Sequence, residues 1–218
     1  MKIKHWLLLF AVLLLTRFTE AQEVIIDGKI NKKEWSKATN IGGLYAPWED
    51  QIKKDHTTIQ YFIKDGWLFF YFIVKDTTMQ YEPYINERSV AKSDRVELFF
   101  SKNKDLKKYY CFEIDIKGNK LDYRASYHRI FDRSWDYTKI RTASTIIEDQ
   151  YIVEGAIYIN DLDIFRSNNK SFYMAIFRAD YGPQKQQIWY SAKKIRNKQP
   201  DFHIPQPFFK VKTSKFKL

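Results

Sequence analysis

Charged residues recur at alternate positions in segments whose apolar pattern is typical of β-strands. Alternate positions along a strand point to one face of a sheet. These side chains are therefore predicted to share the face opposite the core: Glu97, Glu113, Arg124, Glu154 and Arg178. Such a row can form cross-strand ion pairs worth about 0.2–1 kcal/mol each. It can equally hydrogen-bond the hydroxyl groups of a ligand, and the residue types alone leave both interpretations open.

Aromatic side chains outside the predicted core are candidate platforms for a ligand that carries hydroxyl groups. A flat ring can pack against the C–H face of such a ligand, while charged and polar groups hydrogen-bond its hydroxyl groups. Four residues are candidate platforms. Trp189 follows the polar turn at 182–187, Trp48 and Trp135 lie in predicted loops, and Tyr84 is a further candidate.

The elements that must position these residues are predominantly β-strands. Alternating apolar segments are separated by turn residues at intervals of about eight to twelve positions, which predicts an all-β fold, an antiparallel β-sandwich. A short helix is predicted at residues 31–38, where Asn31 caps the helix and Trp35 faces inward. A second helical turn is predicted at 160–165. No repeat or linker divides residues 22–218, so a single domain is expected.

Two hairpins are predicted from their turn residues. The first joins 57–64 to 67–76 through Asp65-Gly66, a strong two-residue turn signal. Its second strand is apolar on both faces, which is typical of a strand in the middle of a sandwich and places Trp67 in the core. The second hairpin joins 109–116 to 120–128 through Gly118-Asn119.

The predicted register of the second hairpin pairs two sets of charged residues. Glu113 faces Arg124 as an ion pair, and Asp115 faces Asp122 as a like-charge pair. Two carboxylates in that arrangement repel unless they are solvated or bridged by a cation. Solvation is expected, and a calcium site built on Asp115 and Asp122 is the alternative, although calcium needs several more oxygen ligands.

The first 21 residues have the layout of a secretory signal peptide. Lys2, Lys4 and His5 precede an apolar run at 6–15, and small residues place the cleavage site between Ala21 and Gln22. The run is too short to span a bilayer, which takes about 20 residues. The mature protein is therefore expected in the periplasm or at the cell surface. An uncleaved N-terminal anchor is the alternative.

Composition excludes several classes of protein. Among 218 residues there are 37 Lys and Arg against 26 Asp and Glu, a formal net charge of +11. The lysines are scattered except at 193–198 and 210–217, so a nucleic-acid partner is not expected. The single Cys excludes an intramolecular disulfide and a zinc site of several cysteines. A 44% share of hydrophobic residues excludes wholesale disorder.

An ordered series of motifs resembles carbohydrate-binding module family 9. The series starts with Ile-Asp-Gly and Glu-Trp at 26–35 and continues at 71–76, 94–100, 110–114, 151–157, 177–178, Trp189 and 202–205. The resemblance implies a jelly-roll-like sandwich that binds an oligosaccharide or polysaccharide without cleaving it, in the context of polysaccharide catabolism. Family members often accompany xylan-degrading enzymes, and some carry structural calcium.

The resemblance also implies particular site residues. Ligand-binding members clamp a terminal sugar between two tryptophans and hydrogen-bond its hydroxyl groups. Trp189 matches the later tryptophan, whereas the segment 89–93 offers none at the position of the earlier one. The resemblance places Glu97 and Arg178 on the binding side. The residues expected to orient them are Glu113, Arg124 and Glu154.

Two alternatives to sugar binding stay open. A glycoside hydrolase acting on a xylan-like polymer needs two carboxylates about 5–9.5 Å apart, one of them with a raised pKa, and Glu97 and Glu113 could lie that close. Arg124 and Arg178 are expected to lower the pKa values of both carboxylates, the wrong direction for a general acid. The second alternative is a structural or protein-interaction sandwich that has lost its sugar site, which the missing tryptophan favours.

Overall fold

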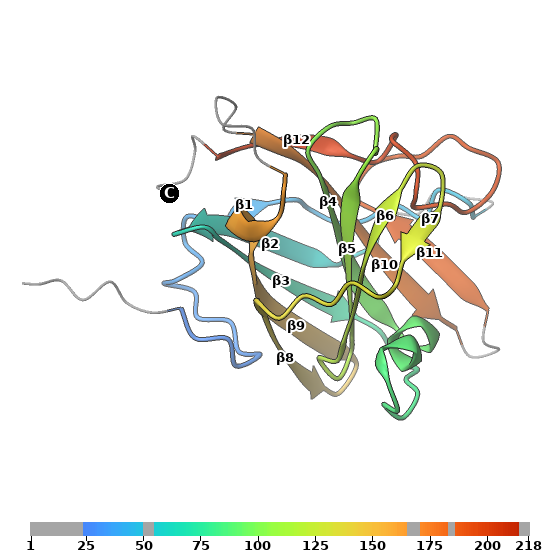
Figure 1. Cartoon of the computed structure of the whole chain (residues 1–218). Coiled ribbons are helices and arrows are strands. Elements are labelled where there is room, and N and C mark those ends of the chain that lie inside the picture. Colours follow the sequence, from blue (N-terminus) through green and yellow to red (C-terminus); the bar gives the residue numbers. More distant parts are fainter. Residues whose placement is uncertain (1–23, 50–54, 165–170, 183–185, 214–218) are drawn as a thin grey trace, which may run out of the picture.

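The structure is a computed structural model that describes residues 24–49, 55–164, 171–182 and 186–213, and it consists of two antiparallel β-sheets (Figure 1). The predicted all-β sandwich is confirmed. The predicted signal peptide lies outside the described residues. Within the described ranges, no helix is long and apolar enough to cross a membrane.

The two sheets differ in size and in strand order. The smaller one runs β1 (Thr39–Asn40), β2 (Thr58–Lys64), β3 (Trp67–Lys75), β9 (Gln150–Tyr158) and β8 (Ile140–Ile147). The larger one runs β11 (Gln187–Ser191), β10 (Ser171–Tyr181), β4 (Arg95–Ser101), β5 (Tyr109–Asp115), β6 (Lys120–Ser126) and β7 (Ile130–Asp132), with β12 (Phe209–Lys212) also paired to β10.

The first predicted hairpin is confirmed in its register. Lys64 pairs with Trp67, and both intervening residues have positive φ, 50° at Asp65 and 79° at Gly66. Two consecutive positive φ angles give the turn whose twist matches that of the flanking strands. β3 lies in the middle of its sheet, as predicted. Its outward-facing Trp67 is half-buried rather than fully buried, because its sheet face is only partly covered.

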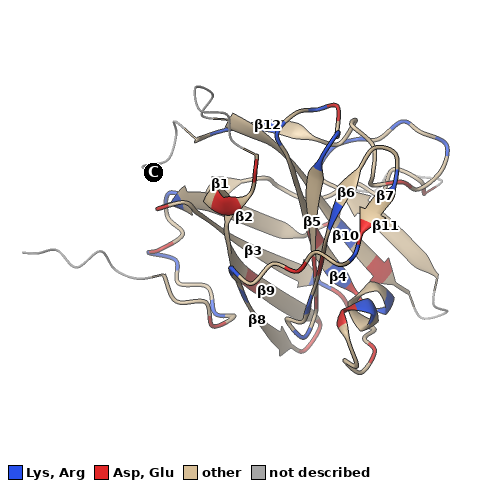
Figure 2. Ribbon diagram, in the orientation of Figure 1, with Lys and Arg blue, Asp and Glu red and all other residues tan. Residues whose placement is uncertain are grey.

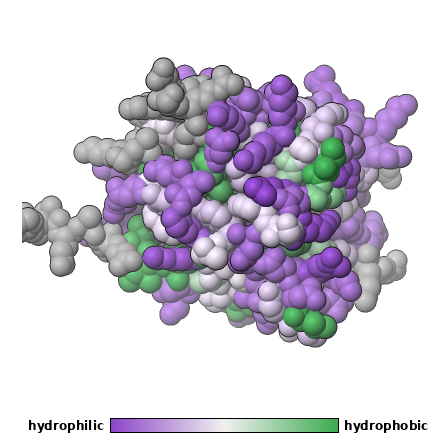
Figure 3. Space-filling view, in the orientation of Figure 1, coloured by the Kyte–Doolittle hydropathy of each residue, from purple (hydrophilic) through white to green (hydrophobic). Residues whose placement is uncertain are grey.

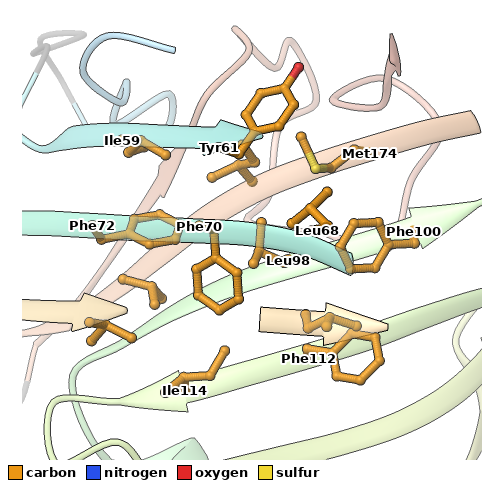
Figure 4. Close-up of a cluster of buried hydrophobic side chains, with 14 of the residues drawn as sticks. Ile59, Tyr61, Leu68, Phe70, Phe72, Leu98, Phe100, Phe112, Ile114 and Met174 are labelled. Carbon is orange, nitrogen blue, oxygen red and sulfur yellow. The ribbon is translucent and has the colours of Figure 1, made fainter. Parts of the chain in front are cut away.

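The main core fills the space between the two sheets. Inward-facing side chains of β3, β4, β5 and β10 interdigitate there (Figure 4), and they include Phe70, Phe72, Leu98, Phe112 and Met174. Each of these five is at most 1% exposed. Burial of such a side chain contributes about 1.5–3 kcal/mol, so this layer fixes how the two sheets face each other.

The register of the β5–β6 hairpin differs from the prediction. Glu113 pairs with Leu121, not with Arg124, and residues 116–119 form the turn. The Asp115 carboxylate accepts hydrogen bonds from the backbone N–H groups of Lys117 and Asn119, each at 2.9 Å. A carboxylate that satisfies turn N–H groups in this way stabilises the longer turn.

The altered register exchanges the two faces of β6, because it differs from the predicted one by an odd number of residues. Leu121 and Tyr123 now lie on the outer face of the sheet, and Arg124 lies on the other. The apolar residues of β6, Leu121, Tyr123 and Ala125, all lie on one face. The neighbouring strand β5 carries buried apolar residues on both of its faces, so the hydrophobic pattern did not determine which face of β5 they join.

Helical structure is limited to two short 3-10 turns in the described part of the chain, η1 (Glu87–Lys92) and η2 (Ile159–Asp161). The second overlaps the helical turn predicted at 160–165, and the first was not predicted. The predicted helix at 31–38 is instead a series of turns, although Asn31 accepts hydrogen bonds there and Trp35 is buried as expected.

Candidate functional site

An open hollow of about 210 Å³ lies on the outer face of the larger sheet. Strands β4, β5 and β6 form its floor, Trp189 of β11 stands on one side, and the segment 200–203 forms part of its rim. The polar and aromatic residues that line it are Arg95, Glu97, Glu113, Tyr123, Arg129, Phe131, Arg133, Trp189, Asp201, Phe202 and His203.

Trp189 is the aromatic wall of this hollow. It pairs with Ala179 of β10, which places its side chain on the outer face of the sheet. The indole is half-buried, and the Phe202 ring contacts it edge-on at 4.9 Å between centroids. The Arg95 guanidinium lies over the indole at 5.5 Å, within the range of a cation–π interaction.

A buried guanidinium between two carboxylates forms the floor. Arg95 Nε donates to Glu113 Oε2 at 2.8 Å, and Glu97 Oε1 lies 2.9 Å from the same nitrogen. Because Nε carries a single hydrogen, Glu97 Oε1 is left buried without a hydrogen-bond partner in the described part of the chain. The Tyr123 hydroxyl donates to Glu113 Oε1 at 2.8 Å.

The pKa of Glu97 is raised, contrary to the predicted direction. Burial disfavours its ionised form most, and the neighbouring Glu113 carboxylate adds to the effect. Arg95 opposes the rise but does not cancel it. Arg124 and Arg178, the two arginines expected to lower the pKa, do not line this hollow.

A segment at 192–208 covers part of the same sheet face beside the hollow. The Phe202 ring stacks on Phe177 of β10 at 3.9 Å. His203 packs against Phe99 and Phe131 at 5.2 and 4.9 Å. Its Nδ1 is hydrogen-bonded to the Tyr109 hydroxyl at 3.0 Å. Burial lowers the pKa of His203 to about 3, so the imidazole is neutral at physiological pH.

Arg178 does not share a face with Glu97, so that prediction is wrong. Glu97 pairs with Phe177 across β4 and β10, and Arg178 is the next residue along β10. Its side chain points between the sheets, where Nη2 contacts Asp76 at 2.8 Å and Asp180 at 3.1 Å. Figure 2 marks charged positions on both strands: Arg95 and Glu97 of β4 face outward, whereas Arg178 and Asp180 of β10 face inward.

The predicted orienting roles of Glu154 and Arg124 are also wrong. Glu154 belongs to β9 of the other sheet, and its Oε2 accepts backbone hydrogen bonds from Asp27 and Gly28, both at 3.0 Å. Arg124 Nε donates to Asp132 of the neighbouring strand β7 at 3.1 Å. Of the three predicted residues, Glu113 alone lies beside Glu97.

The other predicted platforms are not among the residues that line the hollow. Trp48 packs near Phe202 and donates its indole N–H to the Asn197 carbonyl at 3.2 Å. Trp135 stacks on Tyr137 at 5.4 Å at the edge of the main core. Tyr84 is 49% exposed in the segment before η1.

Residues 26–211 match the family model described as "Carbohydrate family 9 binding domain-like". The chain belongs to this family. The match covers most of the sequence and includes every residue of the hollow. Among curated protein sequences, none matches the chain.

Solved structures related to this family 9-like domain show the same fold at low sequence identity. A family 9 carbohydrate-binding module from Caldicellulosiruptor kristjanssonii, in complex with cellotriose, has a TM-score of 0.62 and 15% identity, over 87% of this chain and 89% of that one. The same description with glucose gives 0.61 and 14%, over 87% and 91%. A putative carbohydrate-binding protein from Bacteroides uniformis ATCC 8492 gives 0.66 and 15%, over 82% and 88%.

In this family 9-like domain, Asp115 and Asp122 do not face each other across the hairpin, so the pairing on which the calcium alternative was based is absent. Asp115 caps its own turn, and Asp122 pairs with Phe112. Two other groups of three carboxylates approach one another: Asp76, Asp94 and Asp180, and Glu87, Asp122 and Asp136. Each group contains a cation of the chain itself. Arg178 contacts two members of the first group, and Lys120 contacts all three of the second.

Several residues of the hollow were missed at the sequence level. Arg95 alternates with Glu97 along one strand, so strand periodicity puts both on the same face, but nothing in the sequence indicated that Arg95 contacts both Glu97 and Glu113. Phe202 and His203 come from a segment without regular structure, which no strand periodicity describes. Tyr123 was assigned to the inner face through the incorrect register of β6.

Proposed function

We propose that this protein binds carbohydrate without cleaving it and that the hollow beside Trp189 takes one sugar unit at a chain end or in a short oligosaccharide. The observation that carries the proposal is the half-buried indole of Trp189, which stands beside a hollow whose floor carries Arg95, Glu97 and Glu113. A sugar ring would pack on the indole, and its hydroxyl groups would hydrogen-bond the charged groups that line the hollow.

The size of the hollow supports a single unit. Its volume is about 210 Å³, below the about 300–1,000 Å³ of pockets for drug-sized ligands. The crystallised modules from Caldicellulosiruptor kristjanssonii hold glucose in one case and cellotriose in the other. Both ligands present a glucose unit, and we use these sugars as the first probes.

The arrangement of the carboxylates supports binding over hydrolysis. The raised pKa of Glu97 has the direction that a general acid needs. However, Glu97 and Glu113 both contact Arg95 Nε, so the guanidinium occupies the space between them. A glycosidase needs that space for the scissile bond and, in the inverting class, for a water molecule.

Export is part of the proposal. The N-terminal layout of basic residues, an apolar run and a small-residue cleavage site supports secretion to the periplasm or cell surface, with cleavage near Ala21-Gln22. A polysaccharide-degrading system at that location would supply the chain ends that the hollow binds.

Calorimetric titration with glucose, cellotriose and xylotriose tests the proposal. We expect saturable binding of at least one sugar, and about 30-fold weaker binding by Trp189→Ala, the loss typical of a buried aromatic anchor. Trp67→Ala is the matched control, because Trp67 is a half-buried tryptophan of the other sheet that packs on Tyr158, outside the hollow. Binding that survives Trp189→Ala, or absence of any binding, contradicts the proposal. Release of reducing sugar from xylan by the pure protein would contradict its non-catalytic part.

A further inference from the structure

Most charged side chains that line the proposed sugar hollow are already paired within the chain. Arg95 Nε contacts both Glu97 and Glu113. Arg129 Nη1 donates to Asp201 Oδ1 at 2.9 Å. An ionic group of a ligand would therefore reach these side chains only in competition with contacts that the protein makes itself.

Arg133 is the exception among the charged residues of the hollow. It lines the same hollow, its side chain is exposed, and it has no carboxylate contact among the described residues. Its guanidinium lies over the rings of Phe131 at 5.0 Å and Tyr123 at 5.4 Å. These cation–π contacts hold the guanidinium in place and leave its N–H groups available to an acceptor.

The carboxylates on the other side of Arg133 have a different cation. Glu87 and Asp122 line an adjoining hollow together with Arg133. Lys120 Nζ lies 3.1 Å from Glu87 Oε1 and 2.6 Å from Asp122 Oδ2. The positive charge of Arg133 is therefore available to a ligand in the hollow beside it.

Arg133 and Trp189 reach the hollow from opposite edges of the larger sheet. Trp189 belongs to β11 at one edge, and Arg133 directly follows β7 at the other. Both side chains line the same hollow. A sugar ring whose C–H face packs on the indole directs the substituents of its ring edge sideways, so that such a substituent can meet the guanidinium.

We infer that the hollow prefers an acidic sugar unit, a uronic acid, and that Arg133 binds its carboxylate. The inference rests on the proposed function and names the class of sugar. A guanidinium forms paired N–H···O bonds with a carboxylate, and these are stronger than its bonds to a neutral hydroxyl group. Burial raises the pKa of Glu97, which reduces the negative charge on the floor and hence the repulsion that a bound uronate would meet.

The charge of the whole chain favours the same class of ligand. Its 37 Lys and Arg against 26 Asp and Glu give a formal net charge of +11, which attracts anions towards the protein. The face of the molecule in Figure 3 is predominantly hydrophilic, with separate hydrophobic patches. Such a surface suits a charged ligand rich in hydroxyl groups better than an apolar protein partner.

Calorimetric titration with matched neutral and acidic sugars tests the inference, with glucose against glucuronate and galactose against galacturonate. We expect the uronate to bind about fivefold to tenfold more tightly in at least one pair, the gain from a charge-assisted contact at an exposed position. Glucuronamide keeps the shape of glucuronate without its charge and should bind no more tightly than glucose. Arg133→Gln should bring the ratio of uronate affinity to neutral-sugar affinity close to one.

Arg88→Gln is the matched control, because Arg88 is an exposed arginine of the adjoining hollow that does not line this one. It should keep the ratio of the original protein. Equal affinity for uronate and neutral sugar overturns the inference while leaving the proposed function intact. A preference that survives Arg133→Gln, or that glucuronamide shares, also overturns it. Binding of no sugar in any form removes the proposed function together with the inference.

Discussion

Two arginines on opposite faces of the larger sheet have neighbours of the same kinds, one aromatic ring and at least two carboxylates. Arg95 lies over the Trp189 ring at 5.5 Å, and Arg178 lies over the Tyr190 ring at 5.0 Å. The two rings are consecutive residues of β11, so one points outward and the other inward. Each guanidinium also contacts two or more carboxylates.

The two arginine clusters differ in what completes them. Arg178 is satisfied by the protein itself, through Asp76, Asp180, Asp55 at 3.6 Å and the Tyr151 hydroxyl at 3.2 Å. The Arg95 cluster instead opens on a hollow. Each cluster has one carboxylate oxygen that is buried without a hydrogen-bond partner in the described part of the chain, Glu97 Oε1 and Asp180 Oδ1. Similar residues are thus enclosed within the sandwich on one face, whereas on the other they line the proposed sugar site.

Removal of the inner guanidinium should have the largest effect on stability. Arg178→Met leaves buried carboxylates without their cation, which costs about 3–5 kcal/mol of the free energy of unfolding. Urea unfolding measures this loss. Sugar affinity of the folded variant should stay within twofold of the original. A loss of stability below about 1 kcal/mol, or a marked loss of sugar affinity, would remove the distinction between the two clusters.

Neutralisation of a single carboxylate should weaken sugar binding in the outer cluster but not in the inner one. Glu97→Gln should weaken sugar binding about tenfold, the effect of losing a charge-assisted hydrogen bond. Asp180→Asn is the matched control, because Asp180 Oδ1 is also buried without a hydrogen-bond partner in the described part of the chain. It should leave sugar affinity unchanged in the same titration. If both variants bind sugar equally well, the unpartnered oxygen of Glu97 has no role in binding.

Acid should lower the free energy of unfolding through His203, which is buried on the outer face of the larger sheet. Its folded-state pKa of about 3 lies below the usual 6.5, so below pH 6.5 the unfolded chain takes up a proton that the folded protein excludes. The stability from neutral His203 is therefore present above pH 6.5 and falls towards pH 3 by up to about 1.4 kcal/mol per pH unit. His203→Asn should reduce the acid slope of the unfolding free energy.

The inner cluster should respond to pH in the opposite sense. Burial raises the pKa of Asp94 to about 7, so its contribution is present below pH 3.8 and is lost as pH rises through 7. For His203 itself, the contradicting result is a His203→Asn variant whose unfolding free energy keeps the same slope between pH 4 and 6. That result would show that the outer face does not hold the imidazole neutral.

Loss of the Tyr190 hydroxyl should have the smallest effect. Tyr190→Phe keeps the ring over Arg178, so we expect the free energy of unfolding to change by no more than about 0.5 kcal/mol. Sugar affinity should stay within twofold in a calorimetric titration, since the side chain points away from the hollow. A large loss of affinity would mean that ligand reaches the inner face.

The strand pattern predicted most of the architecture, because a strand that is buried on one face shows a clear alternation of apolar and polar residues. It gave the β2–β3 hairpin in its register and placed Arg95 and Glu97 on one face of β4. It failed where both faces are apolar. β5 has buried apolar residues on both faces, so the apolar face of β6 could join either one until the Asp115 carboxylate fixed the turn. β10 also carries buried residues on both sides, which obscured the orientation of Arg178.

The candidate site could be predicted only where regular strands supply it. Glu97 and Glu113 were predicted from strand periodicity, and Trp189 from its place after a polar turn and from the family resemblance; all three line the hollow. Phe202 and His203 reach the hollow from the irregular segment 192–208, whose path depends on tertiary packing against Phe177 and Phe99 rather than on local sequence. Glu154 was misassigned because alternation gives a face within a sheet but does not tell which sheet a strand joins.

The most direct test of sugar binding at the outer cluster is NMR of the tryptophan indole N–H signals during titration with cellotriose. The account predicts that the Trp189 signal shifts progressively to saturation, while the signals of Trp35 and Trp135, which pack in or against the core, stay in place. Saturable shifts at Trp135 or Trp67 with Trp189 unmoved would place the sugar elsewhere and contradict the account.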